Sequence, residues 1–196
     1  MTIPRQLPNA ITIARIPLAV VFFVLLLMGG TYGERDLALR WVAGALFLLA
    51  ISTDWVDGYL ARKYDIVTDF GKLWDPIADK LLTGAGFVGL ALLGEWPWWV
   101  VAVILVREWA ITVHRFVVAS QHIVAAAWMG KVKTLVQGVA LSWCLLPLQQ
   151  LVGGGVWNGV GIVLMYAALV LTVVSGIDYI VAQVRGGRTA EPKASA

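Results

Sequence analysis

Six long apolar stretches, separated by short polar or turn-forming segments, follow one another along the 196-residue chain. Each stretch is long enough to cross a bilayer as a helix, which takes about 20 apolar residues. We therefore expect six transmembrane helices, at about residues 11–28, 37–60, 74–93, 98–119, 132–151 and 156–184. The pattern predicts an all-α integral membrane protein without a separate soluble domain.

The segments between these stretches carry ordinary helix-breaking residues, such as Gly94-Glu95-Trp96-Pro97 and Gly153-Gly154-Gly155. The first stretch lacks a clean small-x-small cleavage site and is followed by further spans, so it is expected to be a retained helix and not a signal peptide. One membrane domain over residues 1–184 is predicted, with residues 1–9 as a short interfacial segment and the polar residues 185–196 as a disordered tail.

Composition supports the membrane class, because 60% of the residues are hydrophobic, only 14% are charged and the mean hydropathy is +0.81. The single cysteine, Cys144, excludes an internal disulfide. The formal net charge is +3, but the basic residues are spread out and no nucleic-acid motif is present. An anionic membrane surface and anionic substrates are therefore expected, and nucleic acid is not.

Lysine and arginine asymmetry predicts which side of the membrane the termini occupy, because cytoplasmic loops are enriched in these residues. With the amino terminus inside, the cytoplasmic set would be Arg5, Arg62, Lys63, Lys72, Lys131, Lys133, Arg185, Arg188 and Lys193, against Arg35 and Arg40 outside. Both termini and the polar end of the second and third stretches are thus predicted to be cytoplasmic.

Four carboxylates lie where the second stretch ends and the third begins. Asp54 and Asp57 are three residues apart and Asp75 and Asp79 are four apart, so each pair shares one face of a helix. If the two helices are antiparallel neighbours, all four acids converge, and they would repel one another without cations between them. Hard divalent cations such as Mg²⁺ or Mn²⁺ prefer carboxylate oxygen and bind together with substrate phosphates.

Other readings of this stretch are simpler. The four acids could instead form loop salt bridges with nearby Arg62, Lys63, Lys72 and Lys80. The small residues Gly58, Ala61 and Gly71 would let a bulky ligand approach the backbone, or would let helices pack closely. We interpret Pro76 as structural, in the first turn of the third helix, and His114 and His122 as polar packing residues and not metal ligands.

The acidic stretch matches a known signature. The pattern Asp54-x-x-Asp57-Gly58-x-x-Ala61-Arg62-x8-Gly71-x-x-x-Asp75-x-x-x-Asp79 resembles the complete motif of the CDP-alcohol phosphotransferase family, with every defining position present. Near the start, Pro8-Asn9-x-x-Thr12-x-x-Arg15 is similar to the family's amino-terminal segment. The segments Arg107-Glu108, Arg115 and Gly130-Lys131-Val-Lys133-Thr134-x-x-Gln137 resemble the bacterial branch that makes phosphatidylglycerophosphate.

The resemblance implies a six-helix membrane enzyme, usually a homodimer, in the bacterial inner membrane with its active site facing the cytoplasm. CDP-diacylglycerol would donate its phosphatidyl group to glycerol 3-phosphate, which gives phosphatidylglycerophosphate and CMP. Two divalent cations, Mg²⁺ or Mn²⁺, would be held by Asp54, Asp57, Asp75 and Asp79, and Asp79 would also be the general base. The CDP moiety would be bordered by Asp54, Asp57, Gly58, Ala61, Arg62, Gly71 and Asp75.

Choice of the acceptor must come from outside the shared motif, and a phosphate on the acceptor requires cations. The candidates are Arg107, Arg115, Lys131 and Lys133, since arginine offers bidentate contacts and lysine a point charge. Arg107 could equally pair with Glu108 or with one of the aspartates, and Lys131 and Lys133 could serve only topology.

Two alternatives stay open at this point. The same chemistry could use another acceptor, such as inositol phosphate, phosphatidylglycerol or serine. A cation transporter is the alternative of a different class, but it predicts paired interrupted helices and internal repeats, neither of which is found in the sequence.

Overall fold

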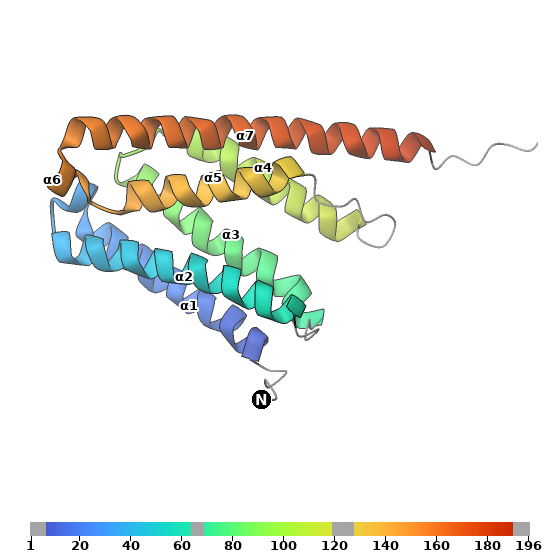
Figure 1. Ribbon diagram of the computed structural model, residues 1–196, viewed down its shortest axis with the longest axis horizontal. Helices are drawn as coiled ribbons and strands as arrows, with labels where there is room; N and C mark the ends of the chain where they lie inside the picture. The colour runs from blue at the N-terminus through green and yellow to red at the C-terminus, as the bar shows by residue number, and fades with distance from the viewer. Residues whose placement is uncertain (1–6, 64–68, 119–127, 190–196) are drawn as a thin grey trace, which may run out of the picture.

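Six long helices make up the part of the protein that the structure describes, as expected from the apolar stretches. The computed structural model describes the backbone over residues 7–63, 69–118 and 128–189, and the side chains over 13–53, 74–117, 128–149 and 151–183 (Figure 1). The elements are α1 (Leu7–Gly29), the 3₁₀ turn η1 (Thr31–Gly33), α2 (Leu37–Lys63), α3 (Asp69–Leu92), α4 (Trp98–Val118), α5 (Trp128–Leu145), the short α6 (Gln149–Val152) and α7 (Gly154–Thr189). Within these ranges there is no strand.

Several predicted boundaries are wrong: α1, α3 and α5 begin four or five residues earlier than expected, and two helix ends differ as well. The predicted helix over 132–151 ends at Leu145, because Pro147 cannot donate a backbone hydrogen bond and disfavours helix in the residue before it. A single turn, α6, follows, and Gly153 adopts φ 91° where the chain turns into α7. At the other end α7 runs to Thr189, since a formed helix extends without a new nucleation cost, so residues 185–189 are helical and not tail.

The remaining terminal predictions lie outside the described residues. These are residues 1–6 of the expected interfacial segment and residues 190–196 of the expected tail. The segment 7–9 of the interfacial prediction is already part of α1.

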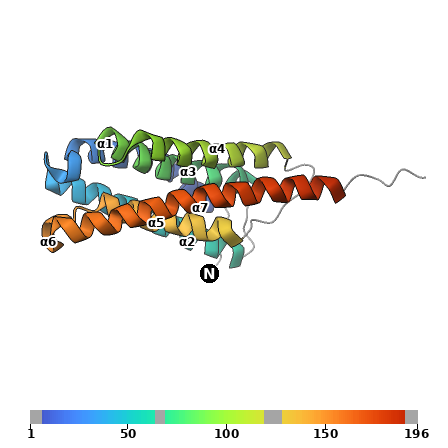
Figure 2. The ribbon, with the colours of Figure 1, turned by 90° about the horizontal axis from the view of Figure 1, so that it is seen from above.

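The helices form an elongated bundle in which α7 runs along one side and α1 and α2 along the other, with α3 and α5 between them (Figure 1). α1 packs against α2 and α3, while α7 packs against α5 and α4. Seen from above, α4 and α7 run lengthwise beside each other (Figure 2). The bundle is therefore held by long side-to-side helix contacts and not by loops.

Interdigitated aromatic and aliphatic side chains fill the centre of the bundle. Phe22 of α1 and Phe47 of α2 are fully buried, with ring centroids 5.4 Å apart. At Gly89 of α3 an added Cβ would come within 2.5 Å of Leu26 Cδ2, so any larger residue would force the Leu26 side chain to shift. Close contact at small residues is how helices associate in a membrane, where no hydrophobic driving force acts between them.

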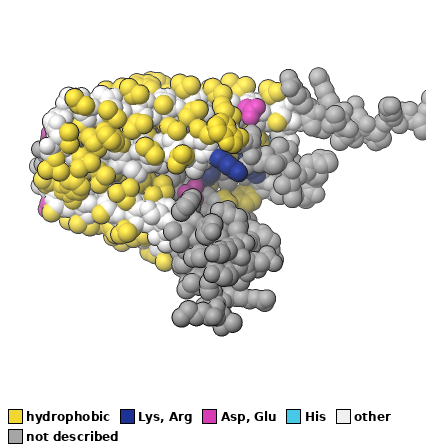
Figure 3. All heavy atoms as spheres, in the orientation of Figure 1, with side chains coloured by type: hydrophobic (Ala, Val, Ile, Leu, Met, Phe, Trp, Pro, Cys, Tyr) yellow, Lys and Arg dark blue, Asp and Glu magenta, His cyan; other side chains and the backbone are white. Residues whose placement is uncertain are grey.

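The outer faces of the helices are strongly apolar. Large side chains such as Val106, Val117, Val156 and Val163 are 68%, 72%, 75% and 68% exposed, respectively. Figure 3 shows one such face, where hydrophobic side chains cover most of the described surface and charged ones are few. A surface of this kind would be an aggregation hazard in water and is suited to lipid.

One helix passes a strict test for a membrane span by length and composition alone. Among the described residues this is Gly154–Gln183 of α7, with a mean hydropathy of 2.4, while Ile13–Gly29 and Leu37–Thr53 are shorter apolar helices. The described apolar parts of α1 and α2 are shorter than a span, whereas α4 carries the charged residues Arg107, Glu108 and Arg115 in its 21 residues.

A buried ion pair ties the helices together at the end of the bundle that holds η1 and α6. Arg40 of α2 is fully buried and donates from Nη1 and Nη2 to the two carboxylate oxygens of Glu95, both at 2.8 Å. Its Nε donates to the carbonyl of Leu145 at 3.0 Å, and Nη2 also donates to the carbonyl of Cys144 at 3.0 Å. Arg40 therefore joins α2, the α3–α4 turn and the end of α5.

This arrangement was not foreseen, because the sequence placed Arg40 simply on the outer side of the membrane. Burial raises the pKa of the Glu95 carboxyl, while the charge of Arg40 and its hydrogen bonds act in the opposite direction. Desolvation thus offsets much of the attraction, and the pair mainly fixes the positions of the elements that it joins.

We predict that Glu95→Gln lowers the free energy of unfolding by about 3 kcal/mol, because it leaves the Arg40 guanidinium buried without its counter-charge. The measurement is thermal unfolding in detergent micelles. The matched control is Glu34→Gln, which changes an exposed glutamate at the same end of the bundle and should leave the melting temperature unchanged. Equal melting temperatures for the two variants would show that the pair has no such role.

Candidate active site

The acidic motif lies at the end of the bundle opposite to the Arg40 and Glu95 pair. Asp54 and Asp57 are in the last three turns of α2, Asp75 and Asp79 are in the first three turns of α3, and the two helices contact each other. The backbone therefore brings both halves of the motif to the same end of the molecule, as predicted. The convergence of the four carboxylates stays a prediction, because some of their side chains are not described.

The predicted residues without a described side chain are Asp54, Asp57, Gly58, Ala61, Arg62 and Gly71. Where side chains are described, no group of three or more histidine, cysteine, aspartate or glutamate residues is placed to hold a metal ion. Asp54 and Asp57, half of the predicted ligand set, lie outside the described side chains.

The two aspartates of α3 differ in their surroundings. Asp75 is exposed, whereas Asp79 is half-buried and lies within electrostatic range of Arg15, Lys80 and Lys133. Asp79 therefore faces a positively charged region inside the bundle. Pro76, between them, is inside α3 and not in its first turn as predicted, because the helix already begins at Asp69.

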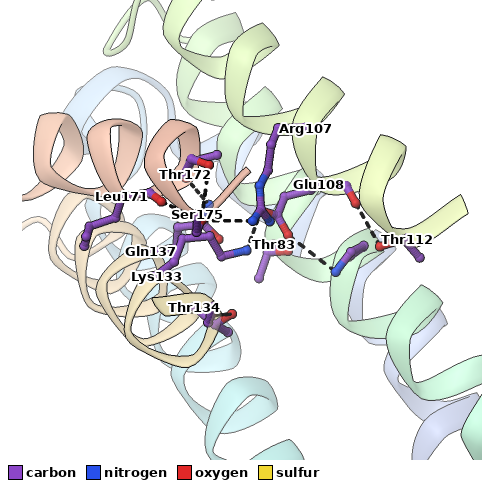
Figure 4. Close-up of polar contacts among 12 residues, drawn as sticks. Thr83, Arg107, Glu108, Thr112, Lys133, Thr134, Gln137, Leu171, Thr172 and Ser175 are labelled. Atoms are coloured by element: carbon purple, nitrogen blue, oxygen red, sulfur yellow. Dashed lines mark hydrogen bonds and ion pairs between the residues drawn. The ribbon is translucent and has the colours of Figure 1, made fainter. Parts of the chain in front are cut away.

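A cluster of charged residues from three helices lies close to Asp79. It consists of Lys80 of α3, Arg107 and Glu108 of α4, and Lys133 of α5, and we call it the Glu108 cluster (Figure 4). Arg107 Nη1 donates to Glu108 Oε1 at 2.9 Å, and Lys133 Nζ donates to the same oxygen. Lys80 Nζ lies 3.5 Å from Glu108 Oε2. One carboxylate thus contacts three cations.

Side chains of α7 hold this cluster from the other side. Ser175 Oγ donates to its own helix at the carbonyl of Leu171, 2.6 Å away, so its free lone pair accepts from Arg107 Nη2 at 2.9 Å. One turn earlier, Thr172 accepts from Gln137 Nε2 at 2.8 Å. Gln137 is one turn from Lys133 on α5, so α7 contacts two of the three helices that supply the cations, α4 and α5.

Arg107 runs close along the backbone of α7. A Cβ at Gly176 would lie 3.4 Å from both Cγ and Nε of Arg107, so the absence of a side chain there makes room for the guanidinium. Among the residues whose side chains are described, Arg107 Nε is the one buried side-chain polar atom without a hydrogen-bond partner. The Arg107 side chain is thus held in one position, and its guanidinium still has an N–H donor without a partner.

The structure brings together two of the four basic residues predicted for the acceptor phosphate. Arg107 and Lys133 meet at Glu108, which also matches the alternative that Arg107 pairs with Glu108. Lys131 is exposed on α5. Arg115 is exposed and lies over the ring of Tyr179, with its guanidinium carbon 5.4 Å from the centroid.

Two cluster members had not been predicted as site residues. Lys80 was considered only as a loop salt-bridge partner, and Glu108 only as a partner for Arg107. Their place within apolar helices could have identified Lys80 and Glu108 as members of a charged site, since each charge there needs a counter-charge. The packing role predicted for His114 agrees with its Nδ1, which lies 2.9 Å from Tyr179 Oη, whereas His122 is outside the described residues.

A cavity of about 430 Å³ lies at the opposite end, beside the Arg40 and Glu95 pair. Several of the polar groups that line it already have internal partners. Glu95 binds Arg40, Trp143 Nε1 donates to the carbonyl of Trp157 at 3.0 Å, and Gln149 Nε2 donates to the carbonyl of Tyr32 at 3.4 Å. We therefore place the candidate active site at the Glu108 cluster and Asp79.

Known proteins are similar to this chain over most of its length. A family model described as CDP-alcohol phosphatidyltransferase matches residues 5–174, which include Asp79 and the whole Glu108 cluster. The chain is 42% identical over 180 residues to the probable phosphatidylglycerophosphate synthase of Mycobacterium tuberculosis (strain ATCC 25618 / H37Rv), covering 92% of this chain and 82% of that protein.

Two relatives carry the full name of a reaction. The CDP-diacylglycerol--glycerol-3-phosphate 3-phosphatidyltransferase of Bacillus subtilis (strain 168) is 42% identical over 181 residues, covering 89% of this chain and 93% of that protein. The protein of the same name from Rickettsia prowazekii (strain Madrid E) is 37% identical over 182 residues, covering 91% and 96%. With the family match over most of its length and the helical bundle described above, the chain belongs to the CDP-alcohol phosphatidyltransferase family of all-α membrane proteins.

Proposed function

We propose that the protein transfers the phosphatidyl group of CDP-diacylglycerol to glycerol 3-phosphate, which yields phosphatidylglycerophosphate and CMP in phospholipid biosynthesis. The names of relatives that are 42% identical over about nine-tenths of the chain support the reaction. The observation that carries the proposal for the site is the Glu108 cluster beside Asp79, because three cations against one carboxylate suit a phosphorylated acceptor.

The proposed site suits a lipid substrate with a charged, water-exposed head group. The acyl chains of CDP-diacylglycerol stay in the bilayer while its charged head reaches water, so the reaction requires a site at an interface. The acidic motif and the Glu108 cluster are at one end of an apolar bundle, which meets that requirement. The lysine and arginine asymmetry of the sequence supports the cytoplasmic face of the bacterial inner membrane for this end.

The donor diphosphate is assigned to the acidic motif. We propose that Asp54, Asp57, Asp75 and Asp79 hold two divalent cations, Mg²⁺ or Mn²⁺; the family is generally dependent on divalent cations. The spacing of Asp75 and Asp79 by one helical turn and the exposure of Asp75 fit this role, since carboxylates are preferred ligands of hard cations. Such cations, when bound, neutralise the diphosphate and stabilise the departing CMP.

The other residues of the motif are assigned to the CDP moiety. Gly58, Ala61 and Gly71 offer little bulk next to the helix backbone, and Arg62 adds a positive charge near the phosphates. Their position on α2 and α3, next to the four aspartates, supports this proposal.

Asp79 is the proposed general base. Its carboxylate accepts the proton of the attacking hydroxyl of glycerol 3-phosphate, and the hydroxyl oxygen forms a bond to the phosphorus of the phosphatidyl group. The bond between that phosphorus and the bridging oxygen of CMP breaks, and CMP leaves with the electron pair. The half-buried position of Asp79 within electrostatic range of Lys133 supports this assignment.

The phosphate of the acceptor is assigned chiefly to Arg107 and Lys133, with Lys80 added from the structure. Arg115 and Lys131 were candidates from the sequence, and their exposed positions suit attraction of the anion from a distance and not direct binding. A homodimer also belongs to the proposal, because exposed apolar faces of the helices could pack against a second copy.

The deciding experiment uses purified protein in detergent with CDP-diacylglycerol, Mg²⁺ or Mn²⁺, and one acceptor at a time. Glycerol 3-phosphate should give CMP and phosphatidylglycerophosphate, identified by lipid mass spectrometry. Turnover with inositol phosphate, phosphatidylglycerol or serine, but not with glycerol 3-phosphate, would replace the proposed acceptor.

We predict that Asp79→Asn lowers kcat by about 10²–10⁴-fold, since an amide cannot accept the hydroxyl proton. The melting temperature should change little, and binding of Mn²⁺, followed by electron paramagnetic resonance, should persist in part. Activity close to that of the unmodified protein would exclude the proton-accepting role.

Lys133→Met should reduce kcat/KM for glycerol 3-phosphate by roughly 10–100-fold, because a charged hydrogen-bond donor contributes about 1.5–3 kcal/mol. Lys131→Met is the matched comparison, as it removes the same charge from an exposed position on the same helix, and its loss should be below about 3-fold. A larger loss for Lys131→Met than for Lys133→Met would contradict the assignment.

Removal of divalent cations by EDTA should abolish CMP release, and added Mg²⁺ or Mn²⁺ should restore it, because the four carboxylates then have no cation to bridge them to the diphosphate. Ca²⁺, with its longer oxygen distances, should restore less. Full activity after exhaustive chelation would refute the metal assignment.

A further inference from the structure

We infer that Glu108 is the positioning residue of the acceptor site, and that it sets the charge of that site to suit a phosphomonoester dianion. The inference rests on the proposed function and extends it to a residue with no part in the chemical step. Its basis is the contact of one carboxylate with three cations from three different helices.

The carboxylate of Glu108 holds three cations together. Oε1 of Glu108 accepts from both Arg107 and Lys133, and Oε2 faces Lys80. The side chain of Lys133 is only 4% exposed and that of Lys80 is 17% exposed, so water does little to hold either ammonium in place. Without a central anion the three cations would repel one another in an apolar setting, which costs far more there than in water.

Glu108 is itself held in position by contacts of its own helix, α4. It follows Arg107 on α4, and the Arg107 guanidinium is fixed on its far side by Ser175 and by the close approach to Gly176. Thr112 Oγ1 donates to the Glu108 carbonyl at 2.8 Å and thus tightens the same turn of α4. A fixed carboxylate can therefore orient the ammonium groups of Lys80 and Lys133.

The basic residues of the cluster keep N–H donors that could bind a ligand. Each lysine ammonium has three N–H donors and needs only one to reach Glu108, while the guanidinium of Arg107 has five. The cluster can therefore donate several further hydrogen bonds to one oxyanion without releasing Glu108. Figure 4 shows Arg107, Glu108 and Lys133 meeting in one small region between α4, α5 and α7.

The net charge of the Glu108 cluster suits a doubly charged anion. Three cations and one carboxylate leave two positive charges in the Glu108 cluster. Two positive charges match a phosphomonoester, which carries nearly two negative charges above about pH 7. A phosphodiester, with one negative charge, or a zwitterion such as serine matches less well.

The test compares Glu108→Gln with the unmodified protein, with Glu34→Gln as the exposed matched control. We expect Glu108→Gln to raise KM for glycerol 3-phosphate by about 10–100-fold, with KM for CDP-diacylglycerol and kcat at saturating acceptor changed by less than about 3-fold. Glu108→Asp keeps the charge but shortens the side chain, so it should recover part of the loss. If Glu108→Gln does not fold, an increase in the same KM in Glu108→Asp is the measurement that decides.

A second readout needs no turnover. In the unmodified protein, methyl phosphate should raise the melting temperature and inhibit competitively with glycerol 3-phosphate at concentrations about 10-fold below those needed for dimethyl phosphate. This preference should shrink in Glu108→Gln. Failure of the unmodified protein to use glycerol 3-phosphate would refute the proposed function itself. An unchanged KM in Glu108→Gln, equal increases in KM for both substrates, or no preference for methyl phosphate in an active protein would overturn only the role of Glu108.

Discussion

A charged side chain inside an apolar bundle is stable only when an opposite charge or sufficient hydrogen-bond partners are in contact with it. This constraint shapes both ends of the structure. At one end Arg40 pairs with Glu95 and binds carbonyls of α5, and at the other Glu108 gathers cations from α3, α4 and α5. Between the two ends the helices meet through aromatic, aliphatic and small residues, so the polar contacts fix how the apolar segments align.

Both ends of the bundle contain ion pairs between buried or half-buried side chains, but the net charge of the two groups differs. Arg40 and Glu95 cancel each other, both side chains are 1% exposed, and the guanidinium also binds backbone carbonyls, so little capacity remains for a ligand. The Glu108 cluster keeps an excess of positive charge and lies next to Asp79. Charge that is balanced holds the fold together, and charge left in excess can attract a substrate.

Much of the fold could be predicted from the sequence, because six apolar stretches of bilayer length allow few other arrangements. Local exceptions were missed where one residue overrides a pattern, as Pro147 does at the end of α5. The acidic motif was predicted to lie at one end of two neighbouring helices, and the backbone confirms this. The partners of Arg40, Lys80 and Glu108 could not be predicted, because the side of a helix that a charge faces depends on how distant helices pack.

The length of α7 determines how deep the candidate active site lies. Ser175, which holds Arg107, is 21 residues after Gly154, the first residue of that helix, and this separation corresponds to about 32 Å along the axis. The hydrocarbon core of a bilayer is about 30 Å thick. If Gly154 lies near one boundary of the core, Ser175 lies near the other, and the helix has roughly another 20 Å to its end at Thr189. That last part then passes through the head-group region toward the water from which a soluble acceptor arrives.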